Sequence, residues 1–93
     1  MSSEAARQPV ELLLIRSEPP CRRCQDTVAV LQAVAEALPG RVTVRVVSTE
    51  DAECARYGAV LTPMVVVNGK IACAGTVPVR SGLERLVAAE LAR

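Results

Sequence analysis

The chain has no histidine, tryptophan or phenylalanine, and its single aromatic residue is Tyr57. Proteins that bind single-stranded nucleic acid usually stack the bases on several aromatic rings, so this composition argues against that class. The net charge of +1, from eleven basic and ten acidic residues, predicts neither a nucleic acid nor an acidic membrane surface as partner. No apolar run approaches the roughly 20 residues that a membrane span needs. We therefore expect a core of aliphatic side chains and a function that needs no nucleic acid.

The N-terminal segment is mostly polar and lacks the apolar stretch of a signal peptide. We expect residues 1–9 to form a flexible leader and residues 10–93 a single domain, because 93 residues leave no room for a second one. The protein is then expected in the cytoplasm, where disulfides are usually transient, catalytic or sensing. The four cysteines are accordingly expected to serve chemistry or to fill the core.

Hydrophobic periodicity predicts an α/β chain with the element order β-α-β-α-β-β-α. Continuous apolar runs indicate strands covered on both faces, and apolar residues at three- and four-residue steps indicate helices with one buried face. The expected elements are a strand over 10–16, a helix over 25–38, a strand over 41–47, a short helix ending near 57, a hairpin of strands 64–67 and 70–74 around Asn68-Gly69, and a final helix.

Local capping signals predict where the two later helices begin and end. Ser48, three residues before Asp51, resembles an N-cap, and Gly58 is expected to end the short helix. Ser81 and Glu84 match the capping box of the final helix. The buried face of that helix is expected to consist of Leu83, Leu86, Val87 and Leu91.

Two cysteines separated by two residues, Cys21 and Cys24, lie between the first predicted strand and the first predicted helix. A pair at such a turn can close a small disulfide ring, or hold a reactive thiolate over the first turn of the helix. We expect Cys21 to be the attacking thiol and Cys24 the resolving one. The positive end of the helix favours the thiolate. Arg22 and Arg23 are candidates for tuning it further, although they can equally be solvated surface residues.

Other roles for the cysteines stay open at this stage. A zinc site would need two ligands beyond the pair, and only Cys54 and Cys73 are available. The pair could also be inert. Cys54 and Cys73 are expected to be small buried side chains, or one of them an exposed regulatory thiol.

Two distant signals together resemble the thioredoxin fold, namely Cys21-x-x-Cys24 after the first strand and Thr62-Pro63 before the third. More narrowly, the chain is similar to the small thioredoxin-like or glutaredoxin-like redox-active disulfide proteins. This resemblance implies a central mixed four-stranded sheet flanked by helices. It also implies that Pro63 is cis and faces the dithiol, and that the backbone of Thr62 binds the substrate.

The chain departs from the proteins that it resembles at three places around this site. Pro20 stands where thioredoxins carry Trp, and Arg22-Arg23 replaces their Gly-Pro. Gly75 stands alone where many glutaredoxins have a glycine pair that seats glutathione. Thr76-Val77-Pro78 matches the Thr-Val-Pro of glutaredoxins, but it follows the hairpin instead of preceding it, so we expect Pro78 to be a trans connector.

The leading hypothesis is a thiol–disulfide oxidoreductase that exchanges with a protein or small-molecule disulfide through Cys21 and Cys24. It would need no bound cofactor, and an upstream reductase or a thiol pool would recharge it. The alternative is a soft-metal module that holds an ion such as Cu(I) between the same two thiols. A third hypothesis is a partner-binding domain in which the dithiol is incidental.

Overall fold

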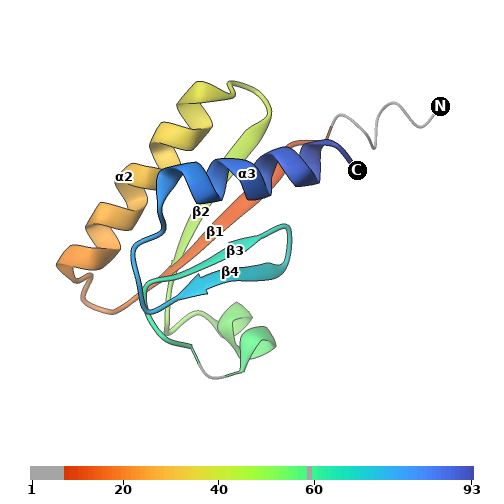
Figure 1. Cartoon of the computed structure of the whole chain (residues 1–93). Coiled ribbons are helices and arrows are strands. Elements are labelled where there is room, and N and C mark those ends of the chain that lie inside the picture. Colours follow the sequence, from red (N-terminus) through yellow and green to blue (C-terminus); the bar gives the residue numbers. More distant parts are fainter. Residues whose placement is uncertain (1–7, 59) are drawn as a thin grey trace.

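The computed structural model describes residues 8–58 and 60–93. The elements follow one another as β1 (Val10–Arg16), α2 (Arg22–Ala37), β2 (Val42–Ser48), the 3-10 helix η1 (Ala52–Tyr57), β3 (Met64–Val67), β4 (Lys70–Ala74) and α3 (Arg80–Leu91) (Figure 1). The predicted order is confirmed, with the second helix of the 3-10 type. The expected leader lies outside the described residues except for Gln8 and Pro9, which belong to no element.

The four strands form one mixed sheet in the order β2-β1-β3-β4. β1 pairs with β2 in parallel and with β3 antiparallel, and β4 pairs antiparallel with β3. The two central strands are apolar along nearly their whole length because both of their faces are covered. The edge strands β2 and β4 contain the polar and half-exposed positions.

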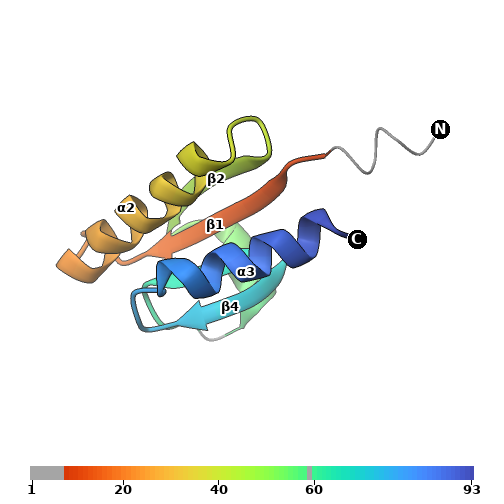
Figure 2. The same ribbon diagram turned by 45° about the horizontal axis from the view of Figure 1, so that its top comes forward.

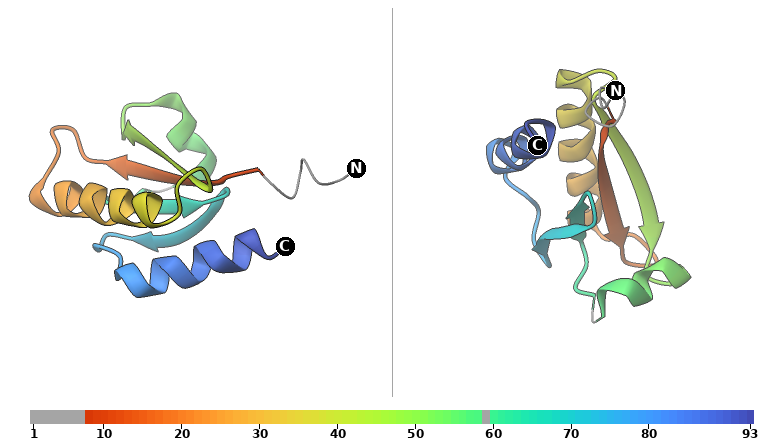
Figure 3. Two further views of the ribbon diagram at one scale, coloured as in Figure 1. Left: turned by 90° about the horizontal axis from the view of Figure 1, so that it is seen from above. Right: turned by 90° about the vertical axis from the view of Figure 1, so that its right-hand side faces the viewer.

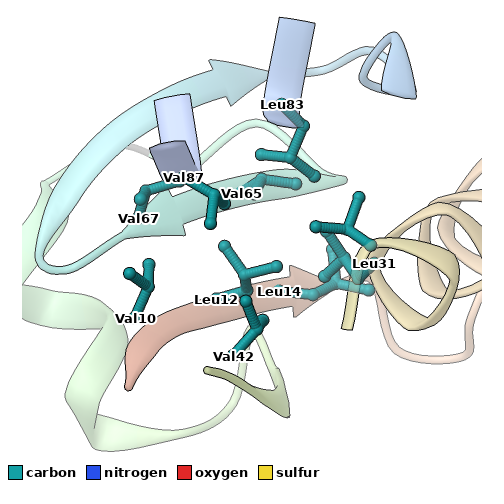
Figure 4. Packing of buried hydrophobic residues seen from close by; sticks show 10 residues of the cluster. Val10, Leu12, Leu14, Leu31, Val42, Val65, Val67, Leu83 and Val87 are labelled. Atoms are coloured by element: carbon teal, nitrogen blue, oxygen red, sulfur yellow. The ribbon is translucent and has the colours of Figure 1, made fainter. Parts of the chain in front are cut away.

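The two faces of the sheet are covered unequally. α2 and α3 lie on the same side, as the right-hand view of Figure 3 shows, and they contact each other (Figure 2). Alternate residues of the central strands pack against these helices in the larger core cluster (Figure 4). The members of that cluster are Val10, Leu12, Leu14, Leu31, Val34, Val42, Val65, Val67, Leu83 and Val87. On the other face, η1 contributes Cys54 to a smaller cluster with Leu13, Ile15, Met64 and Val66, and Val47, Tyr57 and Val60 pack beside it.

α2 begins at Arg22, three residues before the predicted start, and ends at Ala37. Its first turn was missed because Arg22 and Arg23 are exposed and give no apolar periodicity. Its N-cap is Cys21, which is not among the residue types that usually signal a helix start. Cys21 therefore caps the helix, and Cys24 lies within its first turn.

The two predicted caps of the later helices are wrong. Ser48 ends β2, and Asp51 caps η1 by accepting a hydrogen bond from the Glu53 N–H at 2.9 Å. α3 has Val79 at its N-cap with no side-chain hydrogen bond, and Ser81 already lies inside its first turn. A capping box also requires the serine to precede the helix, so the Ser81 match was a coincidence of spacing.

One residue of the predicted buried face of α3 is exposed. Leu83 and Val87 are buried, one turn apart, whereas Leu86 is 45 % exposed. Residues at i and i+4 share a helix face, so a helix that presents Leu83 and Val87 to the sheet turns Leu86 aside. No helix in the described part of the chain is both long and apolar enough to cross a membrane.

Candidate active site at the carboxyl end of β1

Three connections meet at one end of the sheet because of the strand register. Ile15, near the end of β1, pairs with Met64 at the start of β3, and Met64 pairs with Ala74 at the end of β4. The segments that follow β1, precede β3 and follow β4 therefore lie together. The carboxyl ends of parallel strands are where α/β proteins usually place their sites.

The Cys21 sulfur occupies the N-cap position of α2. Cys21 has extended backbone angles, φ −94° and ψ 173°, and its Sγ accepts a hydrogen bond from the Cys24 N–H at 3.4 Å. The Sγ atoms of Cys21 and Cys24 are 3.2 Å apart as hydrogen-bonded thiols. Cys21 is half-buried, whereas Cys24 is only 1 % exposed. One thiol is thus accessible, and the second lies within reach behind it.

These contacts lower the pKa of Cys21 from 9.0 to about 7. The largest cause is the side-chain hydrogen bond between Cys21 and Cys24, followed by the one from the Cys24 backbone N–H. The Ser17 hydroxyl and the Arg23 backbone N–H lower it further, while partial burial opposes the change. About half of the Cys21 side chains are therefore thiolate at neutral pH, which is the nucleophilic form.

Ser17 is a residue of the site that the sequence did not single out. Its backbone N–H donates to Cys24 Sγ at 3.4 Å, and its Oγ lies 3.6 Å from the same sulfur. The hydroxyl also donates to the Pro19 carbonyl at 2.8 Å. The only signal in the sequence was a hydroxyl residue in the short connection before Cys21, which by itself fits any turn.

The two arginines between the cysteines are both exposed, and they differ in their contacts. Arg23 Nη1 donates to the Gly75 carbonyl at 3.2 Å, in the connection after β4. Within the described residues, no hydrogen bond joins either guanidinium to the Cys21 sulfur. Tuning of the thiolate by the charges of Arg22 and Arg23 stays a prediction.

The peptide bond between Thr62 and Pro63 is cis, as is that between Glu18 and Pro19, whereas the bond preceding Pro78 is trans. Pro63 is buried, Thr62 is half-buried, and the preceding Leu61 is 65 % exposed. The binding of substrate by the Thr62 backbone stays a prediction.

Gly75 connects the Pro63 segment to α2. Its N–H donates to the carbonyls of Leu61, at 3.0 Å, and Pro63, at 2.8 Å. Its own carbonyl accepts from Arg23. A short chain of hydrogen bonds thus runs from the helix that bears the dithiol to the segment that bears Pro63.

The other two cysteines lie away from this pair. Cys54 is 6 % exposed and its Sγ donates to the Ser48 carbonyl at 3.3 Å, so its expected role as a small buried side chain is confirmed. Cys73 is half-buried and its Sγ donates to the Thr76 carbonyl at 3.7 Å. Burial raises the pKa of both thiols, which keeps them protonated and weakly nucleophilic at neutral pH.

Within residues 8–58 and 60–93, no three His, Cys, Asp or Glu side chains are grouped closely enough to hold a metal ion. A structural zinc site takes four such ligands. The described residues therefore do not form the four-cysteine zinc site that the sequence allowed as an alternative.

The mixed sheet, the helix-capping thiol and the buried partner thiol define a thioredoxin-like protein of the thiol–disulfide oxidoreductase type. Residues 11–88 match the family model described as a thioredoxin domain, so the chain belongs to the thioredoxin domain family. No curated protein matches it.

Solved structures of thioredoxins share the fold. A chloroplastic thioredoxin z is 20 % identical with a TM-score of 0.74, and the match covers 99 % of this chain and 87 % of that one. Thioredoxin-2 of a malaria parasite is 13 % identical with a TM-score of 0.69, covering 87 % and 82 %. Deadhead, a germline-specific thioredoxin of Drosophila melanogaster, is 16 % identical with a TM-score of 0.65, covering 94 % and 86 %.

Proposed function

We propose that the protein exchanges thiols with disulfide substrates, with Cys21 as nucleophile and Cys24 as resolving thiol. The observation that supports this best is the pair itself. An accessible sulfur caps a helix, its pKa is lowered to about 7, and a buried second thiol lies 3.2 Å away. A nucleophile half ionised at neutral pH is close to the optimum for thiol–disulfide exchange.

The reaction would proceed in two displacements. The Cys21 thiolate attacks one sulfur of the substrate disulfide, and the other sulfur leaves with the bonding electron pair and takes up a proton. Cys24 then loses its proton and attacks the Cys21 sulfur, which releases the second substrate thiol. The substrate gains two electrons, and Cys21 and Cys24 become a disulfide. An upstream reductase or a thiol pool would return the pair to the dithiol.

The substrate we propose is a disulfide in a protein or in a small molecule. Leu61 offers an exposed apolar side chain, and the half-buried Thr62 lies next to the buried Pro63. An extended peptide could lie along this segment while presenting its disulfide to Cys21. The reaction in this direction requires a reducing compartment, and the cytoplasm is the one we propose.

A redox titration of the purified protein in defined dithiol buffers tests this proposal. Alkylation and mass spectrometry at each potential locate the oxidised cysteines. We expect one reversible two-electron transition confined to Cys21 and Cys24, between roughly −300 and −180 mV. Cys54→Ala is the matched control, and it should leave the transition unchanged.

A titration in which this pair shows no transition would contradict the proposal. The same protein titrated with Cu(I) would then test the soft-metal alternative. A complex with one ion per protein that is lost in Cys21→Ser would favour a metal-binding role for the pair.

A further inference from the structure

The resolving step requires the buried Cys24 thiol to become a thiolate. Its side chain is 1 % exposed, so water does not solvate the sulfur directly. A thiolate that forms away from water needs hydrogen-bond donors in the protein. In the reduced protein the Cys21 sulfur is one contact of Cys24, but in the mixed disulfide that sulfur is bonded to the substrate.

Among the described residues, no charged side chain is hydrogen-bonded to the Cys24 sulfur. Arg16 and Glu18, in the connection before the helix, pair with each other at 2.8 Å. Arg23 donates to the Gly75 carbonyl. The segments 61–64 and 74–78 contain no ionisable side chain. The remaining ionisable groups on the first turns of α2 and at the start of α3 are the exposed Arg22 and Asp26, and Arg80, which pairs with Glu84.

Ser17 contacts the Cys24 sulfur with two polar groups. Its backbone N–H already donates to Sγ at 3.4 Å, and its Oγ is 3.6 Å from the same atom. The hydroxyl is bonded to the Pro19 carbonyl at 2.8 Å, so a rotation about one bond would redirect its hydrogen to the sulfur. Ser17 is half-buried, so part of it is open to solvent.

We propose that Ser17 stabilises the Cys24 thiolate during the resolving step. As Cys24 gives its proton to solvent water, the Ser17 hydroxyl turns from Pro19 to Sγ. The hydroxyl and the backbone N–H then both donate to the negative sulfur. This thiolate attacks Cys21 Sγ, and the substrate sulfur leaves with the electron pair and a proton from solvent. The inference rests on the proposed function and assigns a role in it to a residue outside the Cys-x-x-Cys segment.

The test uses the symmetrical disulfide of thionitrobenzoate as the substrate. Rapid mixing follows the release of thionitrobenzoate and so separates the two displacements. The first equivalent reports attack by Cys21, and the second reports resolution by Cys24. Cys73→Ala is included in every variant to remove the half-buried thiol, and Cys24→Ser defines the first phase alone. Ser17→Ala and Ser17→Thr are compared across pH, because threonine keeps the hydroxyl and alanine does not.

We expect Ser17→Ala to resolve about tenfold more slowly at neutral pH, the effect of one lost hydrogen bond to a charged group. The pH of half-maximal resolution should rise by about one unit, while the rate reached at high pH stays that of the parent. In Ser17→Thr, the pH dependence of the resolution rate should be the same as in the parent protein. A side chain that only supports the local packing would instead lower the high-pH rate without moving the midpoint.

An unchanged resolution profile in Ser17→Ala, or a profile that changes equally in Ser17→Thr, would overturn the inference and leave the oxidoreductase intact. Absence of a second phase in the parent protein itself would overturn the proposed function and this inference with it. Thermal unfolding of each variant checks that the two substitutions leave the fold equally stable.

Discussion

The Cys21 sulfur accepts the Cys24 N–H, contacts the Cys24 thiol, and is open to solvent on its remaining side. Hydrogen bonds to a thiolate stabilise the charged form, so these contacts replace the histidine that many reactive cysteines use and this chain lacks. At the scale of single residues, the reactivity of the site therefore depends on Cys24 as much as on Cys21.

Replacing Cys24 should make Cys21 less acidic. The Cys24 thiol is the largest cause of the lowered pKa, so Cys24→Ala should raise the pKa of Cys21 from about 7 towards 9.0. Cys24→Ser keeps a hydroxyl donor at this place and should raise it less. The pH dependence of the iodoacetamide reaction, with the labelled Cys21 peptide quantified by mass spectrometry, measures the midpoint. Equal midpoints in Cys24→Ala and the natural protein would show that the helix end alone acidifies Cys21.

The two arginines provide a matched pair of variants. Arg23→Met removes the hydrogen bond to Gly75, so reduction of a protein disulfide such as insulin should slow about two- to tenfold. Arg22→Met removes an exposed side chain of the same charge and should behave like the natural protein in this assay. The pKa of Cys21 is measured in both. If the pKa of Cys21 rose by a similar amount in both variants, the result would instead support tuning of the thiolate by the charges of Arg22 and Arg23.

At the scale of elements, the site depends on connections held by backbone hydrogen bonds. Gly75 has φ 82°, in the left-handed region that favours glycine, and its N–H bonds to both Leu61 and Pro63. The added Cβ would find room, because the nearest atom, Leu61 Cβ, is 3.6 Å away. The backbone conformation rather than space therefore requires glycine here.

Two glycine substitutions should have effects of opposite sign. Gly75→Ala should lower the free energy of unfolding by about 1 kcal/mol, because alanine is strained at this φ. Gly82→Ala, in the first turn of α3, should raise it by about 0.5 kcal/mol, since alanine favours the helix and the nearest atom, of Arg85, is 3.9 Å away. Urea unfolding measures both. A destabilised Gly82→Ala would show that the start of α3 needs glycine for its packing.

Most of the fold could be predicted from the sequence, because apolar runs and their periods depend on burial. The strands β1, β3 and β4 have the predicted bounds, while β2 and α2 differ by one to three residues at their ends. The errors fall where patterns are short. Asp51 rather than Ser48 caps η1.

The candidate site was predicted in part. The Cys21-x-x-Cys24 spacing is a local pattern that can be read directly from the sequence. The importance of Pro63 follows from the resemblance to thioredoxins. The contacts of Ser17 with Cys24, and of Arg23 with Gly75, join residues whose proximity depends on how the connections fold at the sheet end. The narrower likeness to glutaredoxins stays a prediction.

At the scale of the whole molecule, two acidic groups, Glu53 and Glu90, are held ionised by ion pairs. Arg45 lowers the pKa of Glu53, and Lys70 with Asn68 lowers that of Glu90, in each case through hydrogen bonds. A carboxyl group whose pKa is lower in the folded than in the unfolded state stabilises the fold above its unfolded value. That contribution is lost as the pH falls through the folded value.

Acid should therefore weaken the fold through these two carboxyl groups. We expect the free energy of unfolding in urea to be nearly constant from pH 7 to 5 and to fall below pH 4.5, the ordinary value of both groups. Arg45→Met should make the fall shallower, because Glu53 then titrates similarly in both states. Arg22→Met, whose guanidinium joins no ion pair with the described residues, is the control. If the free energy of unfolding fell equally steeply with pH in both variants, the acid sensitivity would have to come from other carboxyl groups.

The capping of α2 by Cys21 links covalent chemistry to the protection of one amide. As a thiolate, the sulfur holds the Cys24 N–H, and as a disulfide or an alkylated thioether it is a much weaker acceptor. Under the proposed mechanism, each turnover would uncap and recap the helix. The deuterium uptake of the Cys24 amide would then report the redox state of the pair in the intact protein, without a substrate or a chemical tag.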